Sequence, residues 1–130
     1  MPPDNAATIA VGAAVQFPQL GPTSAGGITA LTATTFNLAA IGTYEVTWQV
    51  SVNEAGQLEI ALGGVGLPNT VVGRATGTNQ IVGSTFITTN STNSALSIIN
   101  PVGNAAALTI TPIAGGASAV SATLTIKRLA

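Results

Sequence analysis

The sequence contains no histidine and no cysteine, and only 5% of its 130 residues are charged. Without cysteine the chain has no disulfide bonds, no thiolate nucleophile and no cysteine-ligated metal, and without histidine it lacks the commonest general base of enzymes. We therefore expect a protein that is not an enzyme and that binds no cofactor and no metal.

Positive charge is equally scarce. The basic residues are Arg74, Lys127 and Arg128, and the formal net charge at pH 7 is -1. A protein that binds DNA or RNA neutralises several phosphates with lysine or arginine, so we expect no nucleic-acid partner. A classical signal peptide begins with basic residues, and since the first one here is Arg74 we expect no such leader.

Long apolar runs are also missing, although 46% of the residues are hydrophobic and the mean hydropathy is +0.53. Thr, Gly, Asn or Pro interrupts each run before the roughly 20 residues that a membrane-spanning helix needs, so we expect no membrane partner. High hydrophobicity with low net charge is the opposite of the composition of disordered chains. The length suits one folded domain.

What the sequence does contain is a period-two alternation of apolar and polar residues, which is typical of half-buried β-strands. In residues 44–52, Tyr44 and Trp48 share one face with three valines, and we expect these two aromatic side chains to anchor the core. Similar patterns predict strands at residues 58–62, 70–74, 80–89, 95–100, 108–111 and 119–127.

Clusters of Gly, Pro, Asn and Ser separate these segments at nearly regular spacing, and no segment combines helical periodicity with good helix caps. Many short strands joined by turns predict an all-β protein with two antiparallel sheets, either a sandwich or a jelly roll. We expect this domain to span residues 17–130. Residues 1–16, with their Pro pair and few large apolar side chains, are predicted to form an extended arm outside the core.

The polar faces of the predicted strands carry Thr, Ser, Gln, Asn and Ala, whereas most proteins keep sheet faces and edges apart with charged side chains. Such a surface favours a closed homo-oligomer. A strand with apolar or small side chains on both faces is expected to be buried on both faces. The faces opposite the core are therefore predicted to form an oligomer interface, which is lined by Ala95, Ser97, Ile99 and Thr123.

Four acidic residues are the remaining candidates for catalysis: Asp4, Glu45, Glu54 and Glu59. A hydrolytic pair needs two carboxylates that face one cleft. Asp4 lies in the arm and Glu54 in a turn, whereas Glu45 and Glu59 point away from the apolar faces of their strands. We expect carboxylates that are solvated or lie at an interface.

Three further features have ordinary structural explanations. The run Gly63-Gly64-Val65-Gly66 lacks the lysine and the following helix of a phosphate-binding loop, and predicts a turn that ends a strand. Asn90-Ser91-Thr92 matches a glycosylation sequon, a match that is common by chance. Arg74 either extends to solvent or pairs with a carboxylate across an interface.

The phrase GTYEVTWQV at residues 42–50 resembles the signature strand of the complement- and tumour-necrosis-factor-like (TNF-like) globular heads. The match continues through QLEIALGG at residues 57–64, LPNTVVGRATGTNQIVG at residues 67–83 and LTITPIAGG at residues 108–116. Over roughly residues 36–128, the chain is similar to the C-terminal head domains of the collagen-like exosporium glycoproteins of Bacillus, the BclA-like proteins.

This resemblance implies a jelly roll that forms a homotrimer on filaments at the spore surface, with no catalytic residues, and with other exosporium proteins as further partners. It also implies that the strands at residues 44–52 and 58–62, which look like a hairpin, lie in opposite sheets. Family members usually carry a collagen-like stalk and an N-terminal leader, and this sequence shows neither.

The arm suggests how trimers join. Ile9, Val11 and Val15 are spaced as in a strand that lacks a partner, and an extended segment can add to the sheet edge of another molecule. Three such arms per trimer would join stacked trimers head to tail into a self-assembling endospore appendage. The alternative function is a trimeric receptor- or carbohydrate-binding head, as in phage fibres or lectins.

Overall fold

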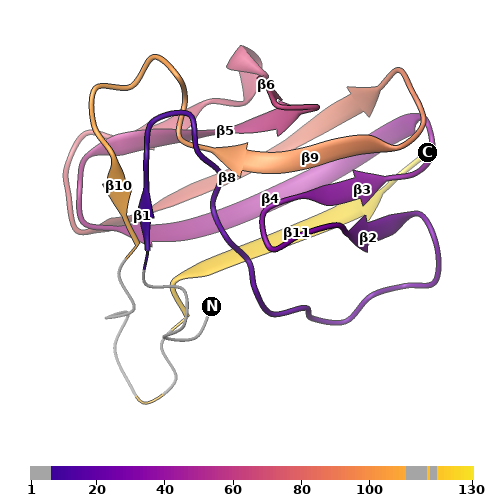
Figure 1. Cartoon of the computed structure of the whole chain (residues 1–130), viewed down its shortest axis with the longest axis horizontal. Helices are drawn as coiled ribbons and strands as arrows, with labels where there is room; N and C mark the ends of the chain where they lie inside the picture. The colour runs from indigo at the N-terminus through magenta and orange to yellow at the C-terminus, as the bar shows by residue number, and fades with distance from the viewer. Residues whose placement is uncertain (1–6, 111–116, 118–119) are drawn as a thin grey trace.

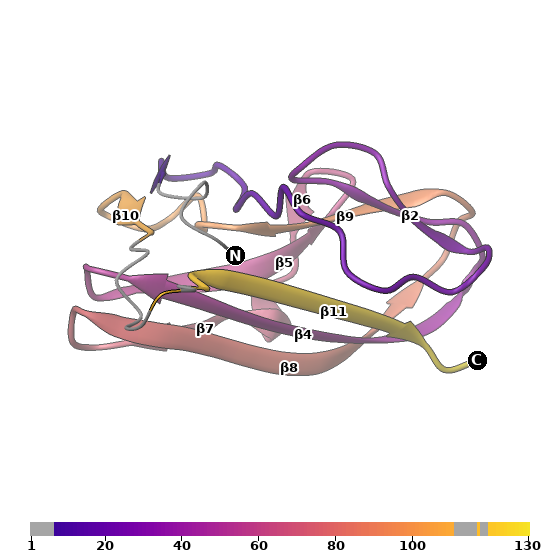
Figure 2. The same cartoon turned by 90° about the horizontal axis from the view of Figure 1, so that it is seen from below.

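Two antiparallel sheets face each other across one hydrophobic core in the computed structural model (Figures 1 and 2). Residues 7–110, 117 and 120–130 are described. The first sheet, here called the β4 sheet, has the order β11-β4-β8, with β4 at Gly42–Val52, β8 at Asn79–Thr89 and β11 at Ala122–Arg128.

The second sheet, here called the β9 sheet, has the order β2-β3-β9-β5-β6. Its strands are β2 (Ile28–Ala30), β3 (Phe36–Leu38), β9 (Ser94–Ile99), β5 (Gly56–Leu62) and β6 (Val65–Gly66), and β7 (Val72–Arg74) also pairs with β5. A small third sheet joins β1 (Thr8–Ile9) to β10 (Leu108–Thr109).

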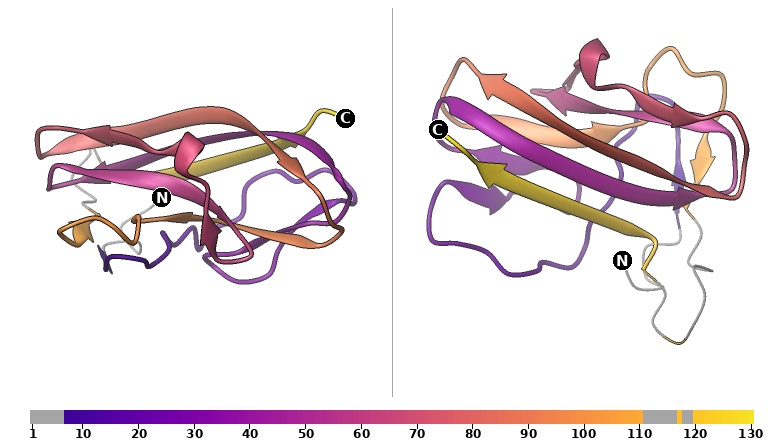
Figure 3. Two further views of the ribbon diagram at one scale, coloured as in Figure 1. Left: turned by 90° about the horizontal axis from the view of Figure 1, so that it is seen from above. Right: turned by 180° about the vertical axis from the view of Figure 1, so that it is seen from behind.

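The prediction of an all-β protein with antiparallel sheets is confirmed, and the arrangement is consistent with a jelly-roll-like sandwich. The described residues contain no α-helix, and a 3₁₀ turn at Pro68–Thr70 precedes β7. The strands β4 and β5 do lie in opposite sheets, as the resemblance implied, although a short turn joins them (Figure 3). Each predicted strand segment contains an observed strand, although residues 111 and 119 of these segments lie outside the described residues. The strand spacing at Ile9 corresponds to β1, which has its partner β10 in the same chain, whereas β2, β3 and β6 were not predicted.

Alternate side chains of β4 form the centre of the core. Tyr44, Trp48 and the valines between and after them are fully buried, and the Tyr44 hydroxyl donates a hydrogen bond of 2.7 Å to the carbonyl of Ala40. Gly83 on β8 lies opposite Trp48, and a Cβ atom at this position would overlap the indole ring. A side chain at residue 83 would therefore displace Trp48.

The prediction that residues 1–16 form an arm outside the core is wrong for residues 7–16. Ile9 is 3% exposed and Val15 is fully buried, and both belong to the same core as Trp48. The backbone of this segment bonds to the chain's own strands, with the Val15 amide donating to the Ile98 carbonyl at 2.8 Å. Asp4 and the rest of residues 1–6 lie outside the described residues.

A buried asparagine holds this N-terminal segment in place. The side chain of Asn100 donates to the carbonyl oxygens of Ile9 at 3.2 Å and Ala106 at 3.1 Å, and its oxygen accepts a bond of 2.7 Å from Asn104. Its backbone also bonds to Ala13 and Gly12. Asn100 therefore connects the end of β9 to the N-terminal segment and to the loop before β10. These three segments are not joined to one another by a regular ladder of β-sheet hydrogen bonds.

Candidate functional site

The three acidic residues that the structure describes lie on separate elements. Glu45 is half-buried on the outer face of β4, Glu59 lies on β5 in the opposite sheet, and Glu54 lies in the turn between these strands. No group of three or more acidic residues within the described part of the chain could hold a metal ion.

Glu54 has a structural partner. Its carboxylate oxygen Oε1 accepts a hydrogen bond of 2.6 Å from the backbone N–H of Thr109. Burial raises the pKa of Glu54, but the hydrogen bonds from Thr109 and from the local backbone outweigh burial and leave the pKa below its ordinary value. The Glu54 carboxylate therefore connects the β4–β5 turn to β10. The hydrogen bonds that it accepts favour its ionised form.

The expectation of a solvated or interface carboxylate is wrong for Glu59, which is 7% exposed within the single chain. The residue points away from the core, as the alternation predicted, but its carboxylate lies against Gly66 of β6, in the space that a side chain at residue 66 would need. Sequence reasoning missed this cover because β6 has two residues and follows a tight turn.

The remaining motifs are surface features. Gly63 and Gly64 both have positive φ and connect β5 to β6, so the predicted strand-ending turn is confirmed. The sequon at residues 90–92 lies in the exposed turn between β8 and β9. Arg74 is exposed on β7 and has no ion pair within the described part of the chain.

The residues predicted for an oligomer interface lie on two different sheets. Ala95 and Ser97 are half-buried on the outward side of β9, whereas Thr123 is exposed on the outward side of β11. Ile99 is only 6% exposed because the chain itself covers it: Ala14 forms a β-bridge with this residue. Its side chain is therefore not available as an interface residue in this structure.

The outer face of the β4 sheet carries two apolar side chains that the prediction omitted. Phe86 is 62% exposed and Val82 is 54% exposed, both on the outward side of β8. Around them lie hydroxyl-bearing residues, among them Thr47 and Ser84, whose oxygens are 2.9 Å apart. The exposed apolar residues of this face could have been predicted from the sequence. At residues 81–82 and 86–87 two apolar residues follow each other, so that one of each pair must lie on the outer face of the strand.

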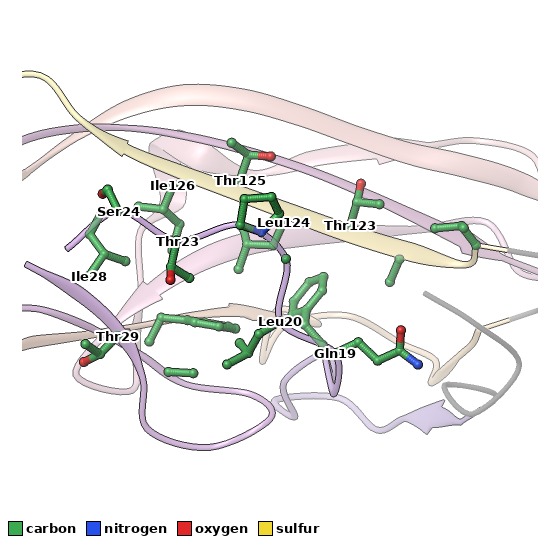
Figure 4. A pocket seen from close by; sticks show the side chains of 17 residues that line it. Gln19, Leu20, Thr23, Ser24, Ile28, Thr29, Thr123, Leu124, Thr125 and Ile126 are labelled. Atoms are coloured by element: carbon green, nitrogen blue, oxygen red, sulfur yellow. The ribbon is translucent and has the colours of Figure 1, made fainter. Parts of the chain in front are cut away.

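A groove of about 710 Å³ opens at one side of the molecule, between β11 and the segment before β2 (Figure 4). None of its lining residues is charged. Leu124 and Ile126 of β11 and Ile28 of β2 are half-buried there, and Leu20 is 66% exposed. Sequence analysis did not identify this groove, because it forms where the outermost strands of the two sheets diverge.

Neither a protein-family model nor a curated protein matches this chain. Within the described residues, there is no helix with the length and hydrophobicity needed to cross a membrane. The described side chains thus form two surfaces with exposed apolar residues: the Phe86 face of the β4 sheet, which also carries Glu45 and Lys127, and the uncharged groove beside β11.

Proposed function

We propose that this protein is a non-catalytic structural subunit that assembles with copies of itself as a homotrimer. The observation that carries this proposal is the outer face of the β4 sheet, where Phe86 and Val82 are exposed beside hydroxyl-bearing residues and beside the oppositely charged pair Glu45 and Lys127. Burial of apolar surface stabilises an interface by about 25 cal/mol per Å² before the costs of association are subtracted. Contiguous exposed apolar side chains commonly mark protein–protein contacts.

Few charged residues lie at such a contact, and one of them, Arg74 of β7, lines a hollow together with Val82. On this face Glu45 of β4 lies in register with Lys127 of β11 and with Phe86 of β8, so the two charged residues are neighbours of opposite sign. A cyclic trimer joins two different patches of each subunit. The Phe86 face provides one of them, and Ala95 and Ser97 on the outward side of β9 remain candidates for the other.

Light scattering on the purified chain tests the trimer. We expect a mass of three chains, and we expect Phe86→Lys to shift the mass toward one chain because a buried unpaired charge is costly. The matched control is Val65→Lys on β6, since Val65 is 69% exposed but belongs to the other sheet. A monomeric parent chain, or equal effects of both variants, would contradict the proposal.

The place of action we propose is a filament on the spore surface, the exosporium. The support is the resemblance of residues 42–50, 57–64, 67–83 and 108–116 to exosporium glycoprotein heads. Immunogold labelling of spores from the organism that encodes the chain should decorate surface filaments. Negative-stain microscopy of the purified chain distinguishes the alternative, because rods indicate a filament subunit and discrete trimers indicate a binding head.

A further inference from the structure

The groove beside β11 has an apolar floor. Phe17 and Phe36 lie there with their ring centroids 6.1 Å apart, edge to face, and both are buried. Leu124 and Ile126 of β11 and Ile28 of β2 also line the groove, but these three side chains are only half-buried. A concave site of about 710 Å³ that is lined mainly by apolar side chains is typical of small-molecule binding sites.

The groove follows the direction of β11. Its lining includes Val120 and residues 122–126, a run of about 20 Å at the rise of an extended strand. Leu124 and Ile126 point from β11 toward the groove (Figure 4). An extended alkyl chain matches this shape better than a compact ring system does.

A positive charge continues the same side of β11 beyond the groove. Arg128 is two residues, or about 7 Å, past Ile126 and has the same phase in the strand. Its Nη2 donates a hydrogen bond of 3.4 Å to the carbonyl of Ile41, and the side chain is exposed and has no ion pair within the described residues. Lys127, in contrast, lies on the outer face in register with Glu45. The groove therefore has an apolar body and a cationic end.

An added strand or a segment of a second copy fits this groove less well. Ala122 on β11 and Gln19 on the facing segment already have interaction partners, so the groove does not present a free row of backbone groups. The exposed apolar side chains Ile41, Val65 and Val102 lie on three separate segments, so none of them provides an apolar ridge of this length. An alkyl chain needs only apolar contacts.

We propose that this groove binds a fatty acid, with its alkyl chain along Leu124 and Ile126 and its carboxylate at Arg128. Binding removes the half-buried floor and the alkyl chain from water together. The carboxylate accepts charge-assisted hydrogen bonds from the guanidinium, whose planar fork matches the geometry of a carboxylate.

Charge sets the preference among single-chain lipids. Decanoate, decanol and decylammonium share one alkyl chain and differ in the charge of the head group. Decanol makes the apolar contacts but offers no negative charge to Arg128, and decylammonium is repelled by it. We expect decanoate to bind most tightly and decylammonium most weakly.

Isothermal titration calorimetry of the purified chain with decanoate and decanol tests this assignment. Arg128→Gln should weaken decanoate binding about tenfold, because a hydrogen bond between charged groups is lost, and should leave decanol binding nearly unchanged. The matched control is Lys127→Gln, which removes the neighbouring positive charge on the other side of the strand and should change neither affinity. Equal losses of decanoate binding in the two variants, or no binding by the parent chain, would overturn the proposal.

A variant that fills the groove tests the position of the alkyl chain. Ala30 on β2 is exposed and lines the groove, so Ala30→Trp adds bulk there without removing a core side chain. It should abolish binding of decanoate and decanol, whereas Val65→Trp on β6, an equal addition outside the groove, should not. Leu124→Gln is the second variant if circular dichroism shows that Ala30→Trp is unfolded. Unchanged binding by a folded Ala30→Trp chain would refute the site.

Light scattering on the same variants separates this site from contacts between copies. If a second copy occupied the groove, Ala30→Trp would lower the mass of the assembly, and that result would overturn the proposal. Phe86→Lys, which tests the trimer, should bind decanoate as the parent chain does, because Phe86 lies on the outer face of β8 and does not line the groove. Failure of the trimer and failure of the fatty-acid site are therefore distinguishable.

Discussion

At the residue scale, Trp48 and Gly83 form one packing unit. The fully buried indole occupies the space that a side chain at residue 83 would need. Its N–H has no hydrogen-bond partner among the described residues, so the ring contributes through packing alone. Trp48→Ala should therefore cost about 3–5 kcal/mol of unfolding free energy, and iodide should quench the native fluorescence poorly.

The matching change on the other strand is Gly83→Ala, which adds a methyl group where no space exists. We expect a loss of about 1–3 kcal/mol in urea unfolding. Combining it with Trp48→Phe should restore part of this loss relative to the sum of the single changes. Gly103→Ala is the control, since a Cβ atom there has no neighbour within 4 Å. Strict additivity would argue against the packing unit.

Glu54 should make stability depend on pH. Its pKa in the folded chain lies below its ordinary value of 4.5, so its contribution is present above that value and is lost as pH falls through the folded pKa. The urea midpoint of the parent chain should decrease more between pH 6 and pH 3 than that of Glu54→Gln. The difference is expected to be small because the carboxylate is partly exposed. Parallel pH profiles would contradict this role.

At the element scale, the N-terminal segment is part of the fold. Val15 is fully buried whereas Val11 is 37% exposed, although both belong to the same segment. Val15→Ala should cost about 2 kcal/mol of unfolding free energy, and Val11→Ala close to zero. Thermal unfolding of the two variants checks this. A smaller effect for Val15 than for Val11 would restore the interpretation of this segment as a free arm.

At the scale of the whole molecule, association should depend little on ionic strength. Only seven side chains carry a formal charge, and the two on the Phe86 face, Glu45 and Lys127, are neighbours of opposite sign. Salt screens charge pairs but leaves apolar burial intact, and sulfate strengthens apolar burial. Light scattering should give the same mass at low and high sodium chloride. Dissociation at high salt would indicate an electrostatic interface instead.

The sequence by itself determined the all-β class, the positions of the long strands and their inner faces. Alternation in residues 44–52 suffices to place Tyr44 and Trp48 on the core side, because a strand directs successive side chains to opposite faces. The two glycines after β5 suffice for its turn, because both adopt positive φ at little cost. These features depend on neighbours in the chain.

Tertiary structure decided what covers each outer face. Glu59 and Ile99 lie on outward positions yet are buried: the Glu59 carboxylate lies against Gly66 of β6, and the N-terminal segment pairs with Ile99 through Ala14. Phe86 has the same outward phase yet is exposed, and an uncharged groove lies beside β11. A period-two pattern gives the direction of a side chain, whereas exposure depends on segments distant in sequence that reach the same face.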